Sequence, residues 1–143
     1  MSKAFDAVIT DSILRLISDF GNGGPLYNWL QTYLVGRVQY VKIKGHVSAS
    51  FTANSGLPQR SHSGPLLFVL VMNKLPDKLI NALILIYSED VKIFLPVKAN
   101  YDCLKLQLDM QSFGQFCSDS GLNVNAEKCS VMTFSRKIAV IEF

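Results

Sequence analysis

Hydrophobic residues near the start of the chain repeat at the spacing of an α-helix. The repeat consists of Ile9, Ile13, Leu16, Ile17 and Phe20. Positions three and four residues apart lie on one face of a helix, so the pattern predicts an amphipathic helix. Either Thr10 or Asp11 is predicted to cap its first turn. Three glycines and a proline within residues 21–25 then break this helix. A second helical stretch is predicted over residues 26–34.

From residue 37 the hydrophobic period changes to two, which predicts a β-hairpin. Val41 and Ile43 point to one side of its first strand. The other side carries Tyr40, Lys42 and Lys44. Gly45 lies near the turn, and residues 46–53 form the predicted returning strand. One face of the hairpin is therefore aromatic and basic, and it is either a solvated strand face or a surface that binds nucleic acid.

The next part of the chain predicts a turn, a buried helix and a second hairpin. Residues 55–58 contain Gly and Pro and predict the turn. The strongly apolar run over 65–75 predicts the buried helix. Two further apolar runs, 83–87 and 91–95, are separated by the Ser-Glu-Asp sequence at 88–90. This arrangement predicts a hairpin with acidic residues at its tip.

A last helix and a last pair of strands complete the predicted fold. The helical stripe consists of Leu106, Met110, Phe113 and Cys117. Gly121 ends this helix, and residues 122–125 and 130–135 predict two short strands. The order mixes helices with hairpins and contains no regular βαβ units. It therefore predicts an α+β domain in which helices cover an antiparallel sheet.

Composition and charge exclude some classes of protein. Of the 143 residues, 49% are hydrophobic, which predicts a well-buried core or apolar surfaces that a missing part would cover. The net charge of +3 permits a nucleic-acid partner without requiring one. Three widely spaced cysteines and two isolated histidines argue against a disulfide framework or a zinc site, and favour a reducing compartment. Charged residues interrupt the apolar region 79–97, so it predicts no membrane span.

The tip of the second hairpin places two adjacent carboxylates, Glu89 and Asp90, between two apolar strands. Burying ionised carboxylates without partners is costly, so the tip is either exposed to solvent or neutralised by a cation. A hard divalent ion that prefers oxygen ligands, such as Mg²⁺, would suit these two groups. The residues alone leave both interpretations open.

Five segments, in the same order and at similar spacing, resemble the motifs of one family. They are Ser2-Lys3-Ala4-Phe5-Asp6-Ala7-Val8, the stretch from Trp29 to Val41, the stretch from Ser55 to Phe68, Tyr87-Ser88-Glu89-Asp90, and the stretch from Gly121 to Cys129. Together they are similar to the reverse transcriptases of non-LTR retrotransposons, near the jockey-like group. The agreement covers essentially the whole chain, and five motifs in register are much more specific than any one of them.

The resemblance implies a partial reverse transcriptase domain over residues 1–143. The chain would supply much of the palm of a right-hand polymerase and a segment of the fingers near residues 23–60, without the remaining fingers and the thumb. Such enzymes are RNA-directed DNA polymerases that use two metal ions, normally Mg²⁺. The implied partners are an RNA template, a DNA primer and deoxynucleoside triphosphates. The location, intracellular and either nuclear or cytoplasmic, stays open, as does the oligomeric state.

The resemblance also assigns roles to single residues. Glu89 and Asp90 match the two acids at the hairpin tip and would be catalytic metal ligands. Phe5 matches the aromatic residue under the incoming sugar, which disfavours a 2′ hydroxyl. Gln59 matches the glutamine beside the incoming nucleotide. Lys128 matches the lysine that protonates the leaving pyrophosphate, a general-acid role.

Three departures from the family pattern predict that the chain does not extend a primer. The first aspartate of the leading motif falls just before Met1, so the metal pair would lack its bridging ligand. Glu89 replaces an aspartate, and a shift of roughly 1 Å in a catalytic group can cost on the order of 10²-fold in rate. Arg60 replaces a glycine beside the nucleotide pocket, where it either blocks the pocket or clasps a phosphate.

Two alternatives to an inactive polymerase fragment remain open from the sequence. The first is a non-catalytic nucleic-acid-binding remnant that uses Tyr40, Lys42, Lys44 and Arg60 on phosphates. The second is a product without function, from a decayed or partial copy of a mobile element, that does not fold stably.

Overall fold

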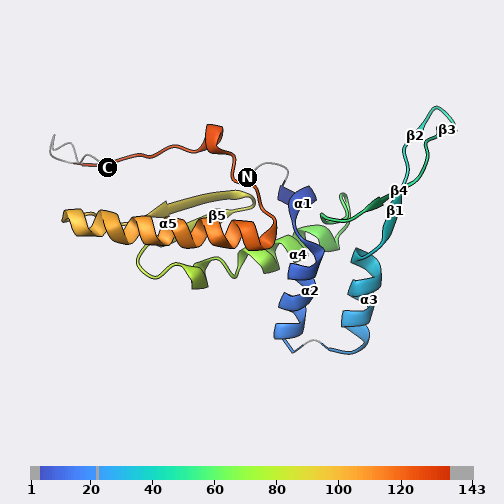
Figure 1. The fold of residues 1–143 in the computed structure, drawn as a ribbon, viewed down its shortest axis with the longest axis horizontal. Helices are drawn as coiled ribbons and strands as arrows, with labels where there is room; N and C mark the ends of the chain where they lie inside the picture. Colours follow the sequence, from blue (N-terminus) through green and yellow to red (C-terminus); the bar gives the residue numbers. More distant parts are fainter. Residues whose placement is uncertain (1–3, 22, 136–143) are drawn as a thin grey trace.

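The computed structural model describes residues 4–21 and 23–135. It shows an elongated molecule with two parts (Figure 1). One part contains the shorter helices and a protruding β-ribbon, and the other contains a β-hairpin with a long helix beside it. Ser2 and Lys3 of the first motif, and residues 141–143 at the end of the chain, lie outside the described residues.

The first three helices are α1 (Ala4–Ala7), α2 (Thr10–Asp19) and α3 (Pro25–Leu34). The two helices predicted from the periodicity are confirmed as α2 and α3, and Pro25 occupies the first turn of α3, where its missing N–H costs nothing. The predicted cap of α2 was wrong, because Ile9 is the N-cap residue and makes no side-chain cap. Thr10 is instead buried in the first turn, and the Ser12 hydroxyl donates to the Ile9 carbonyl at 2.6 Å.

The predicted first hairpin forms a ribbon of two short ladders. Its strands are β1 (Arg37–Gln39), β2 (Lys42–Ile43), β3 (His46–Val47) and β4 (Phe51–Ala53). β1 pairs with β4, and β2 pairs with β3. Between these two ladders, residues 40–41 on the outgoing side lie opposite residues 48–50 on the returning side. The continuous returning strand predicted over 46–53 was therefore wrong. At the interruption, the Val41 N–H donates to the Ser48 hydroxyl at 2.9 Å, and the Ser48 N–H donates to the Val41 carbonyl at 2.9 Å.

The ribbon extends away from the rest of the molecule and buries neither face (Figure 1). Its tip is the Lys44–Gly45 turn, in which both residues have positive φ, as in the two-residue turns that fit the twist of a hairpin. Tyr40 is 61% exposed on the predicted aromatic and basic face, and Ile43 is 64% exposed. Both faces are therefore available to a partner.

Helix α4 (Ser63–Met72) confirms the predicted buried helix and joins the two parts of the molecule. Leu67, Phe68, Val71 and Met72 are buried, while Leu66 on the opposite side is 61% exposed. A short 3-10 helix, η1 (Pro76–Lys78), follows. Helices α2 and α4 contact each other and share one hydrophobic core with the end of the long helix.

The predicted acidic hairpin is confirmed as β5 (Leu83–Tyr87) and β6 (Asp90–Phe94). Tyr87 pairs with Asp90, so Ser88 and Glu89 form the turn and Asp90 opens the second strand. Side chains alternate along both strands, so that Ile84, Ile86, Val91 and Ile93 pack against the core while their neighbours are exposed.

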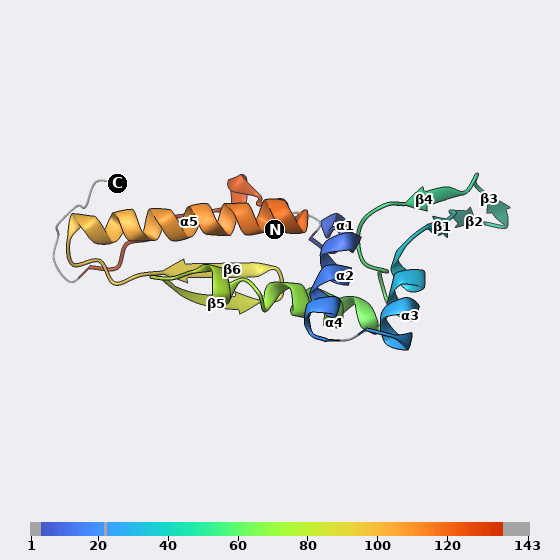
Figure 2. The same ribbon diagram turned by 60° about the horizontal axis from the view of Figure 1, so that its bottom comes forward.

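Helix α5 (Asn100–Ser120) lies alongside this hairpin in both views (Figures 1 and 2). The predicted stripe is confirmed at Phe113 and Cys117, which are buried, and burial raises the pKa of the Cys117 thiol to about 11. Met110 was wrongly assigned to this stripe, because it is 42% exposed. Asp109 is buried in its place, with 2% of its surface exposed.

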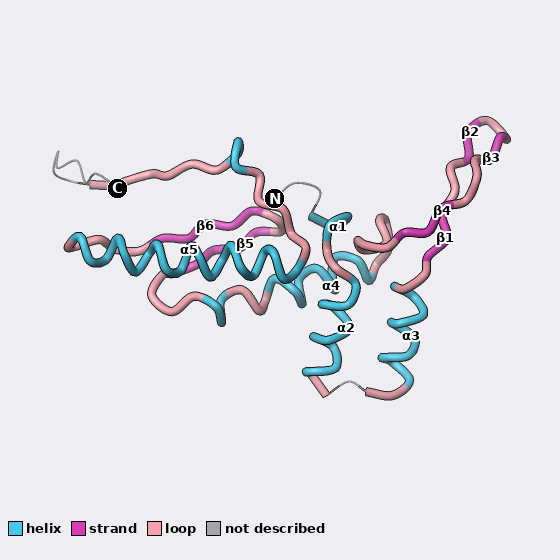
Figure 3. Tube along the Cα trace, in the orientation of Figure 1, coloured by secondary structure: helices cyan, strands magenta, loops and turns pink. Residues whose placement is uncertain are grey.

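Gly121 ends α5 as predicted, with a left-handed φ of 74°. The last pair of strands was wrong, because no described residue after Gly121 belongs to a strand (Figure 3). The Asn125 carboxamide accepts from the Glu127 N–H and starts the 3-10 helix η2 (Ala126–Lys128) between the two extended stretches. Phe134 is 91% exposed, so no packed face holds this segment in a ladder.

The described chain is thus a mixture of helices and small antiparallel sheets, as the α+β prediction required. The predicted single sheet is replaced by three separate two-stranded ladders. Among the helices of residues 4–21 and 23–135, none is long and apolar enough to cross a membrane.

Candidate nucleotide-binding site

Three segments far apart in the sequence meet around residues 5–9. The Leu57 N–H donates to the Phe5 carbonyl at 2.7 Å, and the Gly56 N–H donates to the Val8 carbonyl at 2.9 Å. From the other side, the Ile9 N–H donates to the Ser120 carbonyl at 3.0 Å. The backbone of the first motif is therefore held between the loop of the third motif and the end of α5.

Two glycines allow this close approach. A Cβ atom at Gly56 would lie 2.7 Å from the Asp6 carbonyl oxygen, and one at Gly121 would lie 2.6 Å from the Ala7 carbonyl oxygen. Both residues also have positive φ, which L side chains rarely adopt. Any side chain at either position would push these segments apart. This close packing explains why the third and fifth motifs have glycine at these positions.

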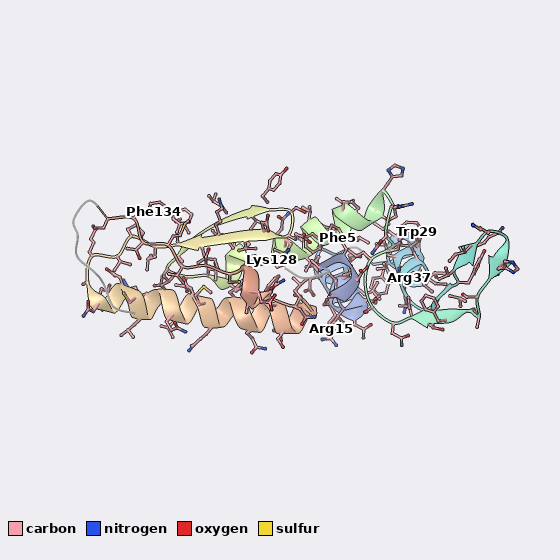
Figure 4. The ribbon with its side chains drawn as sticks, turned by 90° about the horizontal axis from the view of Figure 1, so that it is seen from above. Phe5, Arg15, Trp29, Arg37, Lys128 and Phe134 are labelled. Atoms are coloured by element: carbon pink, nitrogen blue, oxygen red, sulfur yellow. The ribbon has the colours of Figure 1, made fainter. Side chains whose placement is uncertain are left out.

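Phe5 lies at the edge of the core and is half-buried. Its ring stacks on the ring of Phe68, with centroids 4.5 Å apart, and Phe68 itself is 1% exposed. The side-chain view shows Phe5 between the two parts of the molecule (Figure 4). One face of the Phe5 ring is thus fixed by the core while part of the side chain remains accessible.

A cavity of about 610 Å³ opens beside these segments. It is lined by Asp6, Arg37, Val38, Gln39, Ala53, Ser55, Gly56, Leu57, Pro58 and Gln59. The Gln59 amide donates from Nε2 to the Asp6 carboxylate at 2.6 Å, and the Ser55 hydroxyl donates to the Asp6 carbonyl at 3.1 Å. The volume lies within the range of small-molecule sites, about 300–1,000 Å³.

Arg37 belongs to this cavity, although sequence reasoning gave it no role. Its Nε donates to the Leu34 carbonyl at 3.2 Å, and its terminal nitrogen donates to the carbonyls of Ser55 at 3.0 Å and Gly56 at 2.5 Å. The guanidinium therefore bridges the end of α3 and the loop before Gln59. The only signal in the sequence was that the second motif contains an arginine at this position.

Tyr33 joins α3 to the beginning of α4. The Ser63 hydroxyl donates to the Tyr33 hydroxyl at 2.9 Å. Hydrogen bonds with the side chains of Ser61 and then Ser63 lower the pKa of Tyr33 from its usual value. The Ser61 hydroxyl also accepts from the Gly64 N–H at 2.9 Å, which caps the first turn of α4. These contacts fix the far end of the loop that carries Gln59.

Arg60, next to Gln59, is exposed and has a φ of 58°. This left-handed conformation costs a non-glycine residue roughly 1–2 kcal/mol and costs glycine almost nothing. It explains in physical terms why a glycine is the natural residue at this point of the motif. The arginine side chain makes no hydrogen bond or ion pair among the described residues.

Replacing Arg60 with glycine should therefore stabilise the protein by about 1 kcal/mol. Urea unfolding monitored by circular dichroism measures this change. Arg15→Gly is the matched control, because Arg15 is an exposed residue within α2 and glycine there should cost about 1 kcal/mol. Equal destabilisation by both substitutions would show that the positive φ at Arg60 carries no strain.

The acidic tip of the second hairpin points toward the end of the molecule that carries α1 (Figures 1 and 2). Glu89 is half-buried in the turn, and Asp90 is exposed. Mg²⁺ is commonly held by one or two carboxylates together with substrate phosphates. Glu89 and Asp90 are the type of residue that supplies the carboxylate ligands of such a site. Residues 4–21 and 23–135 contain no group of three His, Cys, Asp or Glu side chains able to hold a metal.

The other predicted site residues lie apart from the cavity. Lys128 is exposed in η2, on the C-terminal segment, and Figure 4 shows it well separated from Arg37. Tyr40, Lys42 and Lys44 are exposed on the ribbon, beyond the β1–β4 ladder whose base lines the cavity. Of the predicted site residues, only Gln59 lines the cavity; Phe5 is the neighbour of Asp6, which Gln59 contacts, and the basic ribbon and Lys128 lie farther away.

Comparisons with known proteins agree with this arrangement of motifs. A family model described as reverse transcriptase (RNA-dependent DNA polymerase) matches residues 1–141. The RNA-directed DNA polymerase from mobile element jockey of Drosophila melanogaster is 26% identical to this chain over 120 residues. That match covers 78% of this chain and 13% of the Drosophila protein, so the chain spans a small part of its relative.

Proposed function

Because the chain belongs to the reverse transcriptase (RNA-dependent DNA polymerase) family, we propose that it is a fragment of a non-LTR retrotransposon polymerase that binds an incoming deoxynucleoside triphosphate. One observation carries this proposal. The loop of the third motif hydrogen-bonds to the first motif, so that Gln59 reaches Asp6 next to Phe5 at the edge of a cavity of about 610 Å³. The same proposal holds that the chain does not extend a primer by itself.

Within a right-hand polymerase, the chain would supply the palm and a piece of the fingers. Helices α1, α2, α4 and α5 with the β5–β6 hairpin correspond to the palm, and the segment near residues 23–60 corresponds to the fingers. Support for the fingers assignment comes from the ribbon alone, whose tip strands β2 and β3 are exposed, because α3 and Leu57 within 23–60 share the core with the other helices.

Each predicted residue has a proposed task in the polymerase, including Lys128, which lies outside the cavity in this structure. Phe5, held against Phe68, forms the surface under the sugar and disfavours a 2′ hydroxyl. Gln59 contacts the nucleotide through its amide, and Arg60 reaches a phosphate. Lys128, exposed and without an ion pair among the described residues, is the proton donor to pyrophosphate. Glu89 and Asp90 would hold Mg²⁺, which when bound neutralises the charge of the phosphates.

The nucleotide proposal predicts that Gln59→Ala weakens the binding of dTTP. One neutral hydrogen bond contributes about 0.5–1.5 kcal/mol, so the dissociation constant should rise roughly 3- to 10-fold. Calorimetric titration in Mg²⁺ measures this change. Gln115→Ala is the control, because Gln115 is an exposed residue of α5 whose side chain donates to Asp119 on the same helix. Equal affinity of Gln59→Ala and wild type would exclude Gln59 from the binding site.

A second function, binding of nucleic acid by the ribbon, has a separate observation behind it. Residues 20–76 contain no Asp or Glu, although the chain has 11, and they carry five of its 14 Lys and Arg residues. The only ion pair within residues 4–21 and 23–135 joins Lys105 to Asp102, in α5. The positive charges of the ribbon are therefore not neutralised locally, which favours contact with phosphates.

Binding of single-stranded RNA should accordingly weaken with salt, and the ribbon should account for part of the slope. Removing Lys42 and Lys44 together, as the double glutamine variant, should lower the slope of log K against log salt by about 1.4. Fluorescence anisotropy of a labelled oligonucleotide measures the slope. The matched control replaces Lys98 and Lys105 with glutamine. A slope that falls equally in both variants would mean that the ribbon is not the binding surface.

A further inference from the structure

We propose that Arg37 is a positioning residue, which fixes the loop that carries Gln59 and thereby sets the affinity of the cavity for a nucleotide. This inference rests on the proposed function. Arg37 is the first residue of β1 and is half-buried, directly after Gly36, whose φ is 68°. Arg37 thus lies at the start of the ribbon, and its side chain contacts Ser55 and Gly56, which follow the end of the ribbon.

The three acceptors of Arg37 are main-chain carbonyls from two segments. The Leu34 carbonyl is at the end of α3, and the carbonyls of Ser55 and Gly56 follow β4. No carboxylate takes part, and the ion pair of the described chain lies in α5. The contact is therefore a clamp on main-chain dipoles. A planar guanidinium with five N–H donors can span both segments, whereas the compact ammonium of lysine cannot reproduce this geometry.

The clamp acts on the loop at its tightest point. Gly56 is bonded to Val8 through its N–H and to Arg37 through its carbonyl, and it has no room for a Cβ atom beside Asp6. Gln59 follows three residues later. Without Arg37, the turn would keep its bonds to residues 5–8 and the short β1–β4 ladder before it, but it would lose its connection to the end of α3. At an active site, a misplacement of about 1 Å can cost on the order of 10²-fold in rate, so the position of this loop matters for function.

Because these hydrogen bonds are accessible to solvent, replacing Arg37 should destabilise the fold only slightly. The hydrogen bond to Ser55 is exposed, and the other two are only partly buried. Water can therefore replace the guanidinium at these carbonyls, but it cannot hold the two segments together. A role in positioning should thus appear as lost nucleotide affinity in a protein that still folds.

The test compares Arg37→Lys and Arg37→Met with the control Arg15→Met, which makes the same substitution at an exposed arginine of α2. Three quantities are measured on the full chain: thermal unfolding, the dissociation constant for dTTP in Mg²⁺ on the folded protein, and hydrogen exchange at the Gly56 and Leu57 amides. We expect both Arg37 variants to remain folded, to bind dTTP roughly tenfold more weakly and to exchange these two amides faster. Arg15→Met should match wild type in dTTP affinity and in exchange.

Two results would overturn the inference. Unchanged dTTP affinity in both Arg37 variants would leave Arg37 with a structural role at most. Unchanged exchange at Gly56 and Leu57 would show that the clamp does not hold the loop. If wild type binds no dTTP, the proposed nucleotide site fails, and the exchange data still decide whether Arg37 fixes the loop.

Discussion

Replacing Asp109 with alanine should destabilise the protein by about 3 kcal/mol, because a buried carboxylate and its hydrogen bonds are lost. Asp109 is 2% exposed and lies in the middle of α5. Its two oxygens accept from the N–H groups of Ile80 at 3.2 Å, Asn81 at 2.8 Å and Ala82 at 2.6 Å, and from the Asn81 side chain at 3.2 Å. This single side chain attaches the segment before β5 to the long helix.

Asp109 should also make the stability depend on pH. Burial raises the pKa of Asp109, but the N–H groups of Ala82, Asn81 and Ile80 outweigh burial and leave the pKa below its usual value. A folded pKa below the unfolded one means that the stabilisation is complete above the unfolded value of about 3.9 and is lost as pH falls through the folded value. The loss should therefore occur below about pH 4.

Urea unfolding at pH 7 and at pH 3 measures both effects. Asp109→Asn should be less stable than wild type at pH 7 and should lose less stability on acidification. Asp119→Asn is the control, because Asp119 is an exposed carboxylate of the same helix. Wild-type stability of Asp109→Ala at pH 7 would mean that water replaces the carboxylate without cost.

The second large effect concerns activity, and we expect no RNA-templated primer extension by this chain. Phosphoryl transfer depends almost wholly on how metal ions and phosphates are positioned. The described residues offer two adjacent acids at the hairpin tip and no group of three potential ligands. Glu89 also replaces the aspartate of the family motif, and its longer side chain shifts the carboxylate by roughly 1 Å.

An extension assay with a primed RNA template, Mg²⁺ and all four deoxynucleoside triphosphates measures this activity directly. An active reverse transcriptase on the same template is the positive control. Glu89→Asp should not by itself produce extension, because it adds no third ligand. Synthesis by the wild-type chain that disappears in Asp90→Asn would contradict the expectation.

The helices and the second hairpin could be predicted because their hydrophobic periods are simple. The helical repeat over residues 9–20 buries Ile13, Leu16 and Ile17, although Ile9 and Phe20 at its two ends are exposed. The Ser88–Glu89 turn separates two apolar strands. The relation to the family could also be predicted, since five motifs occur in register along the chain. Local pattern is sufficient where one face of an element packs on the core.

Contacts between distant segments could not be predicted from the pattern. Periodicity places a charged residue such as Asp109 on the outside of a helix, and its burial depends on N–H groups some 27–29 residues away. The three carbonyl partners of Arg37 lie up to 19 residues away, and carbonyls are the same for every residue type. The strand predicted at residues 130–135 failed for a related reason, because alternation in sequence does not supply a partner strand.

Hydrogen exchange with and without dTTP in Mg²⁺ tests the central claim most directly, because it maps the contact of the nucleotide along the chain. The nucleotide-binding account predicts added protection at residues 5–9 and 55–60, where the first and third motifs meet beside the cavity. It predicts no change at the ribbon tip, Lys44–Gly45, or along α5 before Phe113. Protection confined to the ribbon or to α5, or no protection at millimolar dTTP, would contradict the assignment of this cavity to a nucleotide.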